Sequence, residues 1–289
     1  MKTKVHQLGI SIVELMVALL LGVFIILGVV SIFINTKAIA KFQDERLNNQ
    51  SGVRLSELLF GDLLGQAGYM RAPDQLAKYA FPYAAANQEC QEFSENQVVT
   101  PLFENGVGIG VCIRYQPASR LERDCQGNLV KVNENSSIDT PFVPTDTSEL
   151  VILAIKFKPE NDLDKGSILC KNLNSSIGVT EYTPIISNVA DGKLQFWVSE
   201  GDDTGSSVDR FISFSDYKKL ASKPDILGVN FYLLFASSKN MSNQRSKALD
   251  DWLNNFVSNN QARQRLLNND NKRIYQVASG AQVLRNKIP

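Results

Sequence analysis

Histidine is nearly absent from this sequence of 289 residues, in which His6, close to the N-terminus, is the only one. The chain beyond that position cannot form Ser-His-Asp or Cys-His nucleophilic sites or a histidine-ligated zinc site. Glycine loops that cradle phosphates are lacking too, because neither a GxGxxG nor a P-loop pattern occurs. The glycine-rich stretch from Gly106 to Gly110 alternates with apolar residues, which is typical of a strand. We therefore expect a protein that is not an enzyme.

An excess of charge is also lacking, because 30 Lys and Arg residues balance 30 Asp and Glu residues. Such a balance leaves no electrostatic footprint for nucleic acid, so no direct binding to DNA or RNA is expected. No CxxC spacing occurs among the four cysteines, Cys90, Cys112, Cys125 and Cys170. Together with the scarcity of histidine this argues against zinc, and we expect neither a metal nor a cofactor.

A long apolar run is present near the N-terminus. From Leu15 to Ile34 the only polar side chain is Ser31. About twenty helical residues, at 1.5 Å each, span the hydrocarbon core of a bilayer, and the run is too long for the core of an ordinary signal peptide. Lys2 and Lys4 precede it and should hold the N-terminus in the cytoplasm. The sequence therefore predicts a single-pass membrane protein whose remainder lies on the outer side.

The hexapeptide from Gly9 to Glu14 stands directly before this run. A lone carboxylate at membrane depth costs several kcal/mol unless it finds a partner. A short basic leader ending in Gly9, then an apolar residue, a serine and Glu14 five positions beyond the glycine, resembles the class III signal of type IV prepilins and pseudopilins. The resemblance implies cleavage by a prepilin peptidase between Gly9 and Ile10, and N-methylation of Ile10. It also implies that Glu14 docks on the N-terminal amine of a neighbouring subunit, an arrangement that makes a buried carboxylate tolerable.

The N-terminal helix should continue beyond the membrane, because no proline occurs before Pro73. An apolar stripe then recurs at spacings of three and four residues: Leu55, Leu58, Leu59, Leu63 and Ala67. We expect residues 1–9 to be a leader and residues 10–34 to be the transmembrane half of the helix, which becomes the filament core. Residues 35–68 should form its amphipathic half, and residues 69–289 one globular, β-rich periplasmic head.

Within the head, alternating and apolar runs predict strands at Val107–Tyr115, Leu150–Phe157, Lys193–Val198, Ile226–Ala236 and Arg273–Leu284. Apolar residues at helical spacing predict a second amphipathic helix over residues 245–260, whose apolar face should cover the sheet. Residues 78–97 show no period and are expected to be irregular. The fold class is thus α+β, with one long N-terminal helix whose second half packs on an antiparallel β-sheet.

The four cysteines should lie on the oxidising side of the membrane, which predicts two disulfides. Sequence alone allows three connectivities. We favour Cys125–Cys170, which would staple a loop onto the sheet, together with Cys90–Cys112. The segment Glu160–Gly166 alternates oxygen-bearing side chains, but its glycine falls one position late for an EF-hand and no bidentate acid follows. We expect an exposed turn there and no calcium site.

Four further stretches extend the resemblance beyond the N-terminus: Ala67-Gly68-Tyr69, Asp124-Cys125-Gln126-Gly127, Ile226 to Ser237, and Val283-Leu284-Arg285-Asn286. Together they resemble the PilW-type minor pilins of type IV pili. The resemblance implies a type IV pilin-like fold, and a subunit near the pilus tip that helps to initiate assembly and supports twitching motility, adhesion or DNA uptake. Its partners would be other minor pilins, the major pilin and a tip adhesin. Before assembly it would reside in the inner membrane and meet the prepilin peptidase.

Two other classes stay open. A minor, J-type pseudopilin of a type II secretion system shares the leader and a similar head. A signal-anchored periplasmic enzyme or binding protein would make the prepilin motif coincidental, and the scarcity of histidine together with the lack of any convergent motif argues against it.

Overall fold

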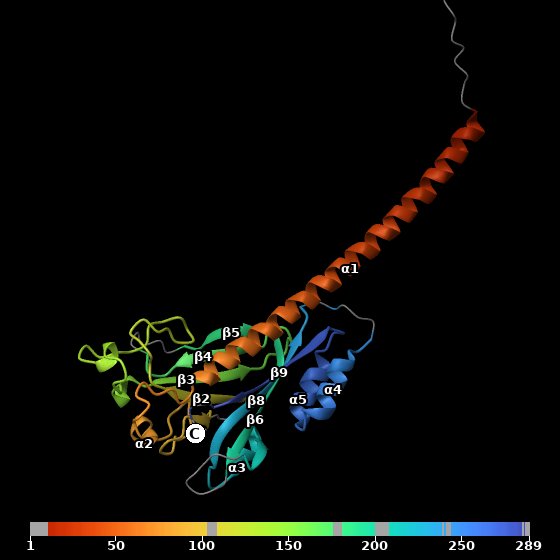
Figure 1. Ribbon diagram of the computed structural model, residues 1–289. Helices are drawn as coiled ribbons and strands as arrows, with labels where there is room; N and C mark the ends of the chain where they lie inside the picture. Colours follow the sequence, from red (N-terminus) through yellow and green to blue (C-terminus); the bar gives the residue numbers. More distant parts are fainter. Residues whose placement is uncertain are drawn as a thin grey trace, which may run out of the picture. The chain divides into compact units, whose positions relative to one another are not determined.

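The computed structural model describes residues 11–102, 109–175, 181–199, 208–238, 240, 244–284 and 286. The chain divides into two compact units, residues 1–47 and residues 48–289. The described part of the first unit consists almost entirely of helix. The second unit contains the rest of that helix and all the strands, so it is the α+β head (Figure 1).

The expected long N-terminal helix is present as α1, Ile12–Gln66, which has 55 residues. It ends two residues before Gly68, whose φ of +74° is the left-handed conformation typical of a glycine that terminates a helix. A Cβ at Gly68 would lie 3.2 Å from the side chain of Val98, so both the backbone angle and the space favour glycine. The N–H of Gly68 donates to the carbonyl of Arg114 at 2.9 Å and so ties the end of the helix to the head.

The strands form two antiparallel sheets, where the sequence predicted one. The first is a five-stranded meander of β1 (Val99–Pro101), β2 (Ile109–Tyr115), β3 (Val151–Lys158), β4 (Ser167–Asn172) and β5 (Thr183–Ser187). The second has the order β7-β6-β8-β9, formed by β6 (Val189–Ser199), β7 (Arg210–Ser213), β8 (Asp225–Ala236) and β9 (Tyr275–Val283). Asn188, with φ +65°, separates β5 from β6, so a single left-handed residue moves the chain from one sheet to the other.

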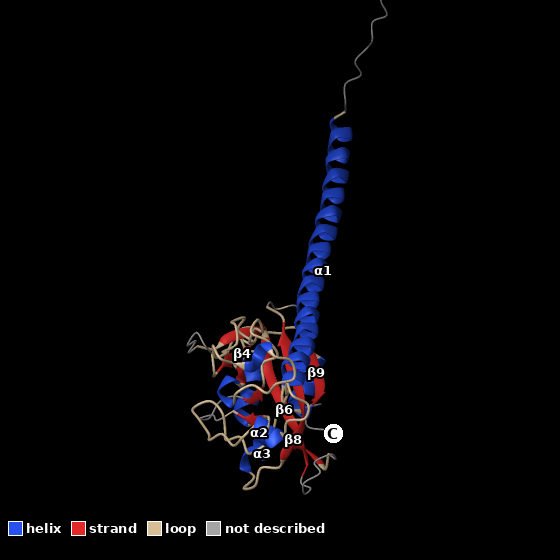
Figure 2. Ribbon diagram, turned by 60° about the vertical axis from the view of Figure 1, so that its left-hand side comes forward, coloured by secondary structure: helices blue, strands red, loops and turns tan. Residues whose placement is uncertain are grey.

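Short helices complete the head (Figure 2). They are α2 (Ala77–Ala80), α3 (Phe214–Lys219), α4 (Lys247–Asn255) and α5 (Asn260–Asn268), with two 3₁₀ turns at Ser137–Asp139 and Thr147–Glu149. The single helix expected over residues 245–260 is wrong in extent. Asn259 accepts a hydrogen bond from the N–H of Gln261 at 2.8 Å and caps a new helix, so the segment divides into α4 and α5.

The expectation that this segment covers the sheet is confirmed. Leu249, Trp252 and Leu253 of α4 are buried against β8 in one apolar cluster. The indole N–H of Trp252 donates to a buried carboxylate oxygen of Asp191 at 2.9 Å, and Arg265 of α5 donates to the carbonyl of Ala190 at 2.8 Å. These bonds fix α4 and α5 on the strands, beside β9 (Figure 1).

The second half of α1 packs into the core of the head. Phe60 stacks on Phe231 of β8 with ring centroids 4.5 Å apart, and Leu63, Leu64 and Ala67 are buried in the same cluster. The predicted stripe is partly wrong, because Leu55 and Leu58 are exposed. The buried face of the helix is instead centred on Phe60, Leu63, Leu64 and Ala67.

Five of the predicted strands correspond to β2, β3, β6, β8 and β9, although residues 107 and 108 of the first lie outside the described part of the chain. The short strands β1, β5 and β7 were not predicted. They have three to five residues each, and two of them contain a proline, so their sequences carry little periodicity.

We predict that Phe60→Ala destabilises the protein strongly, by about 3–5 kcal/mol, because it removes a buried ring and leaves a cavity against Phe231. Leu58→Ala, two residues earlier on the same helix, is the matched control, because 73% of Leu58 is exposed. Urea unfolding of the detergent-solubilised protein, followed by near-UV circular dichroism, measures both. Equal midpoints for the two variants would contradict the packing of α1 on the sheet.

Candidate functional site

The apolar half of α1 is the most distinctive surface in the first unit. Leucine, valine, isoleucine and phenylalanine side chains between Ile12 and Ile34 are exposed around the whole helix. By length and composition, α1 could cross a membrane once, and the most apolar window in it has no buried residue. A helix that is apolar on every side needs lipid or protein around it, because a soluble helix presents only one apolar stripe.

One carboxylate interrupts this surface. Glu14 lies in the first turn of α1 and is exposed, next to the apolar side chains of Val13 and Leu15. The unpaired N–H groups and the dipole of a helix N-terminus favour an anion at this place. The charge nevertheless requires a cation or water once the helix is surrounded by apolar groups. Gly9 and Ile10, the expected cleavage and methylation positions, lie outside the described residues.

All four cysteines form disulfides, Cys90–Cys112 and Cys125–Cys170, which is the pairing favoured from the sequence. The first bond links an irregular segment to β2, and the second links a turn to β4. In both cases one cysteine lies on a strand and the other on a segment without regular structure. Each bond therefore holds a loop against the first sheet.

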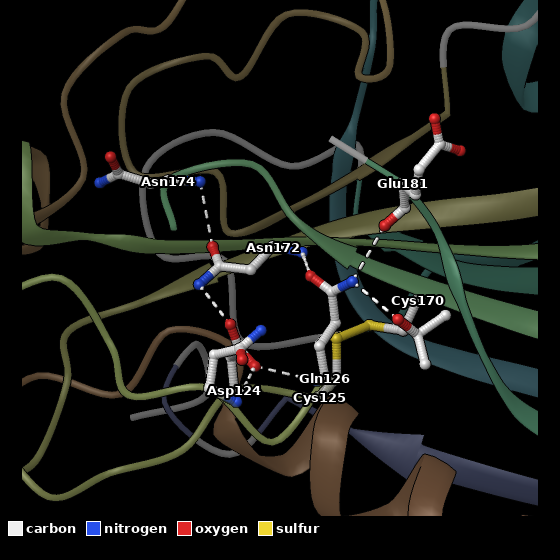
Figure 3. The surroundings of a disulfide bond; sticks show 9 residues. Asp124, Cys125, Gln126, Cys170, Asn172, Asn174 and Glu181 are labelled. Atoms are coloured by element: carbon white, nitrogen blue, oxygen red, sulfur yellow. Dashed lines mark hydrogen bonds between the residues drawn. A yellow bond between two sulfur atoms is a disulfide. The ribbon is translucent and has the colours of Figure 1, made fainter. Parts of the chain in front are cut away.

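The Cys125–Cys170 loop is also held by side-chain hydrogen bonds (Figure 3). One oxygen of Asp124 accepts from the N–H of Gln126 at 2.9 Å, and the other accepts from the amide of Asn172 at 2.9 Å. The side chain of Gln126 accepts from the N–H of Asn172 and donates to the carbonyl of Glu181 at 3.0 Å. The turn is thus anchored to β4 and to the segment before β5 as well as by its disulfide.

Two buried arginines each hold a further irregular segment, and the sequence analysis did not identify them. Arg114 on β2 donates to four backbone carbonyls, those of Phe81, Pro82, Ser94 and Gln97. Burial lowers the pKa of its guanidinium to about 10. Nothing in the local sequence distinguishes this arginine from a solvated one.

Arg71 has the same role for the loop between β2 and β3. Its two terminal nitrogens donate to the carbonyls of Ser137, Ile138, Thr140 and Val143, and the residue is only 9% exposed. The five N–H groups of a guanidinium are suited to bind backbone carbonyls that have no hydrogen-bond partner in a neighbouring strand. Both segments are therefore held by hydrogen bonds from an arginine side chain to backbone carbonyls.

The segment Glu160–Gly166, considered above for calcium, contains an ion pair. Arg273 binds Asp164 at 2.7 Å through one terminal nitrogen and Asp162 through the other. Its guanidinium thus occupies the place between two carboxylates that a cation would need. Within the described residues, no group of three or more His, Cys, Asp or Glu side chains could hold a metal ion.

We predict that Arg273→Met makes stability depend more strongly on pH. Burial, followed by the neighbouring Asp162, raises the pKa of Asp164, whereas Arg273 opposes this rise. Without Arg273 the folded-state pKa rises further above the ordinary value, so the variant loses stability as the pH increases through that pKa. Urea unfolding at pH of about 4.5 and about 7.5 should show a larger deficit at the higher pH. Arg273→Lys keeps the charge and should show a smaller pH effect, and a deficit independent of pH in Arg273→Met would contradict the assignment.

Comparison with known proteins gives no relative of this chain. No protein-family model matches it, and neither a curated protein nor a solved structure matches it. Its function therefore has to be argued from the residues and the geometry described above.

Proposed function

We propose that this chain is a minor pilin of the PilW type, which helps to initiate type IV pilus assembly and resides near the pilus tip. One observation carries the proposal. A single helix, α1, bears an apolar half with one carboxylate, Glu14, in its first turn, and its other half is built into the core of a disulfide-linked head. An anchor that is continuous with the core of its head suits a subunit that moves from lipid into a helical filament.

The mechanism is assembly. A prepilin peptidase cuts between Gly9 and Ile10, the new N-terminus at Ile10 is methylated, and the apolar half of α1 exchanges lipid for neighbouring helices. Gly22 and Gly28 support such contacts, because no described atom outside the local helix lies within 4 Å of where their Cβ atoms would be. Glu14 then pairs with the N-terminal amine of the next subunit, which offsets the cost of enclosing a carboxylate.

The head supports a low-copy subunit over a major one. It contains two sheets and long loops held by disulfides and by Arg71 and Arg114, a large and irregular surface for a subunit repeated along a fibre. Such a surface suits contacts with other minor pilins, the major pilin and a tip adhesin. Before assembly the protein spans the inner membrane once, with the head in the periplasm, and afterwards it belongs to the pilus.

In-frame deletion of the gene, with a complemented strain as control, tests the proposal by counting sheared surface pili beside secreted exoproteins. Loss of pili with normal secretion is the expected result. Normal pili with blocked secretion would instead assign the chain to the J-type pseudopilins of type II secretion, which share the leader and the docking carboxylate. If neither changes, the filament function is wrong.

We predict that Glu14→Ala leaves leader cleavage intact but reduces surface pili about tenfold or more, because removing one partner of an enclosed ion pair costs about 3–5 kcal/mol. Glu57→Ala is the matched control, since Glu57 is an exposed acid on the same helix. Immunoblots of the processed form and counts of sheared pili measure the two steps separately. Normal piliation in Glu14→Ala would refute the docking role.

A further inference from the structure

The two faces of the second sheet differ in what covers them. Phe196, Val229 and Phe231 on the inner face are buried in the cluster that contains α1. On the outer face, α4 and α5 cover the end of the sheet around Leu234 and Ala236. The other outer side chains are exposed or half-buried, among them Gln195, Trp197, Phe211, Asn230, Tyr232, Ser279 and Ala281. This part of the sheet presents rings, amides and small groups to solvent.

The indole ring of Trp197 lies over the backbone of the neighbouring strand. Gly228 is opposite Trp197 in the register of β6 and β8, and a Cβ on it would be 2.9 Å from two carbon atoms of the indole. The ring can therefore lie there only because residue 228 is a glycine. Phe211 of β7 stands nearly at right angles to the indole, at 79° with ring centroids 5.5 Å apart, and is 61% exposed. One ring thus lies on the sheet while the other stands beside it.

Two side-chain amides lie between Trp197 and a second aromatic residue, Tyr232. The indole N–H of Trp197 donates to Oδ1 of Asn230 at 2.8 Å, and the hydroxyl of Tyr232 donates to Oε1 of Gln195 at 3.4 Å. Asn230 and Gln195 are opposite each other in the register. Each amide is held through its oxygen, and within the described residues the structure shows no acceptor for either NH₂ group. Two oriented donors are therefore left to a ligand.

We call this surface, formed by Trp197, Phe211, Asn230, Gln195 and Tyr232, the aromatic-amide face. Its two ends on β6 and β8 are four residues apart along each strand, which is about 13 Å. None of these five side chains carries a charge.

One cation borders the aromatic-amide face. Lys193 is opposite Tyr232 and lies 3.8 Å from Asp191, a buried carboxylate that offsets its charge. The face is thus long enough for a chain-like ligand and offers no unpaired charge to attract an ion.

Rings combined with oriented amides suit a sugar. The face of an aromatic ring is negative, so it attracts the C–H groups on one side of a sugar ring, and the sugar hydroxyls can accept from the two NH₂ groups. Small-molecule sites commonly join aromatic side chains with a few placed polar groups in this way. A fatty chain would leave both NH₂ groups without an acceptor, which costs about 1–3 kcal/mol for each enclosed donor.

A second copy of this chain fits the aromatic-amide face less well. A two-fold contact uses the same surface on both partners, so it would bring NH₂ groups against NH₂ groups. The amide oxygens that could accept from them already accept from Trp197 and Tyr232. A sugar hydroxyl, in contrast, both donates and accepts, and a chain of sugars repeats such groups along its length.

We propose that the aromatic-amide face binds an uncharged oligosaccharide. Its sugar rings stack on Trp197 and Tyr232, and its hydroxyls accept from the NH₂ groups of Asn230 and Gln195. Phe211 contacts the sugar on Trp197 from the side. The proposal goes beyond the filament function and does not depend on it, because it concerns the second sheet of the head alone.

Saturation-transfer NMR of the detergent-solubilised full chain tests this, with cellohexaose and chitohexaose as probes. Lauryldimethylamine oxide is the detergent, because a detergent with a sugar headgroup would compete. We expect transfer from aromatic protons of the protein to the ring C–H groups of at least one probe. Asn230→Asp keeps an oxygen for Trp197 but replaces the NH₂ group, so the dissociation constant should rise about tenfold or more.

Asn135→Asp is the matched control, because it makes the same change at an exposed amide in the loop between β2 and β3, and it should leave binding unchanged. If Asn230→Asp does not accumulate, Gln195→Glu takes its place. It keeps the oxygen that accepts from Tyr232 and removes the NH₂ group, so the affinity should fall to a similar extent.

Three results would overturn the proposal. They are the absence of transfer to both hexasaccharides, equal affinities in Asn230→Asp and Asn135→Asp, and a face that is covered by a second copy. The last would appear in sedimentation as self-association that needs no sugar and that Asn230→Asp abolishes.

Discussion

The contact between Phe60 and Phe231 is the constraint on which the rest of the head depends. It joins α1 to β8, an inner strand and the longest strand of the second sheet. The same apolar cluster extends through residues of β2, β3 and β6, so α1 and both sheets share one core. Glycines allow this approach, because a side chain at Gly52 or Gly280 would collide with the rings of Phe235 or Phe231.

Outside that core, irregular segments are held in place by a few individual bonds. Two disulfides and two buried arginines hold segments in which few backbone groups pair within a sheet. A guanidinium that binds four carbonyls satisfies groups that a strand would otherwise have to pair, and burial of the charge is tolerable because four of its five N–H groups find an acceptor. The loops therefore need no periodic pattern of apolar residues in their sequence to present one defined surface.

The sequence predicted those features that depend on a periodic pattern of apolar residues or on a strict chemical rule such as disulfide formation. The apolar run of α1 and the long strands β3, β6 and β8 follow from periodicity, and the existence of two disulfides follows from the even number of cysteines. The number of cysteines left three connectivities open, of which the favoured one, Cys125–Cys170 with Cys90–Cys112, is present. The second sheet, the division of residues 245–268 into α4 and α5, and the functions of Arg71 and Arg114 could not be predicted. Each depends on contacts between distant residues, which leave no local signal in the sequence.

The second half of α1 also meets the C-terminal part of the described chain. The side chain of Asn49 on α1 donates to the carbonyl of Ile274, 225 residues away, and the side chain of Asn286 donates to the carbonyl of Ala67, 219 residues away. Loop closure over such separations is slow, because the chain must be confined before the contact stabilises it. During synthesis α1 emerges before the strands of the head, and β9 emerges after the other described strands, so these contacts of the helix form only once β9 has been made. The head therefore completes its packing on α1 only after β9 has been made, and until then the apolar face of this half of the helix lacks part of its cover.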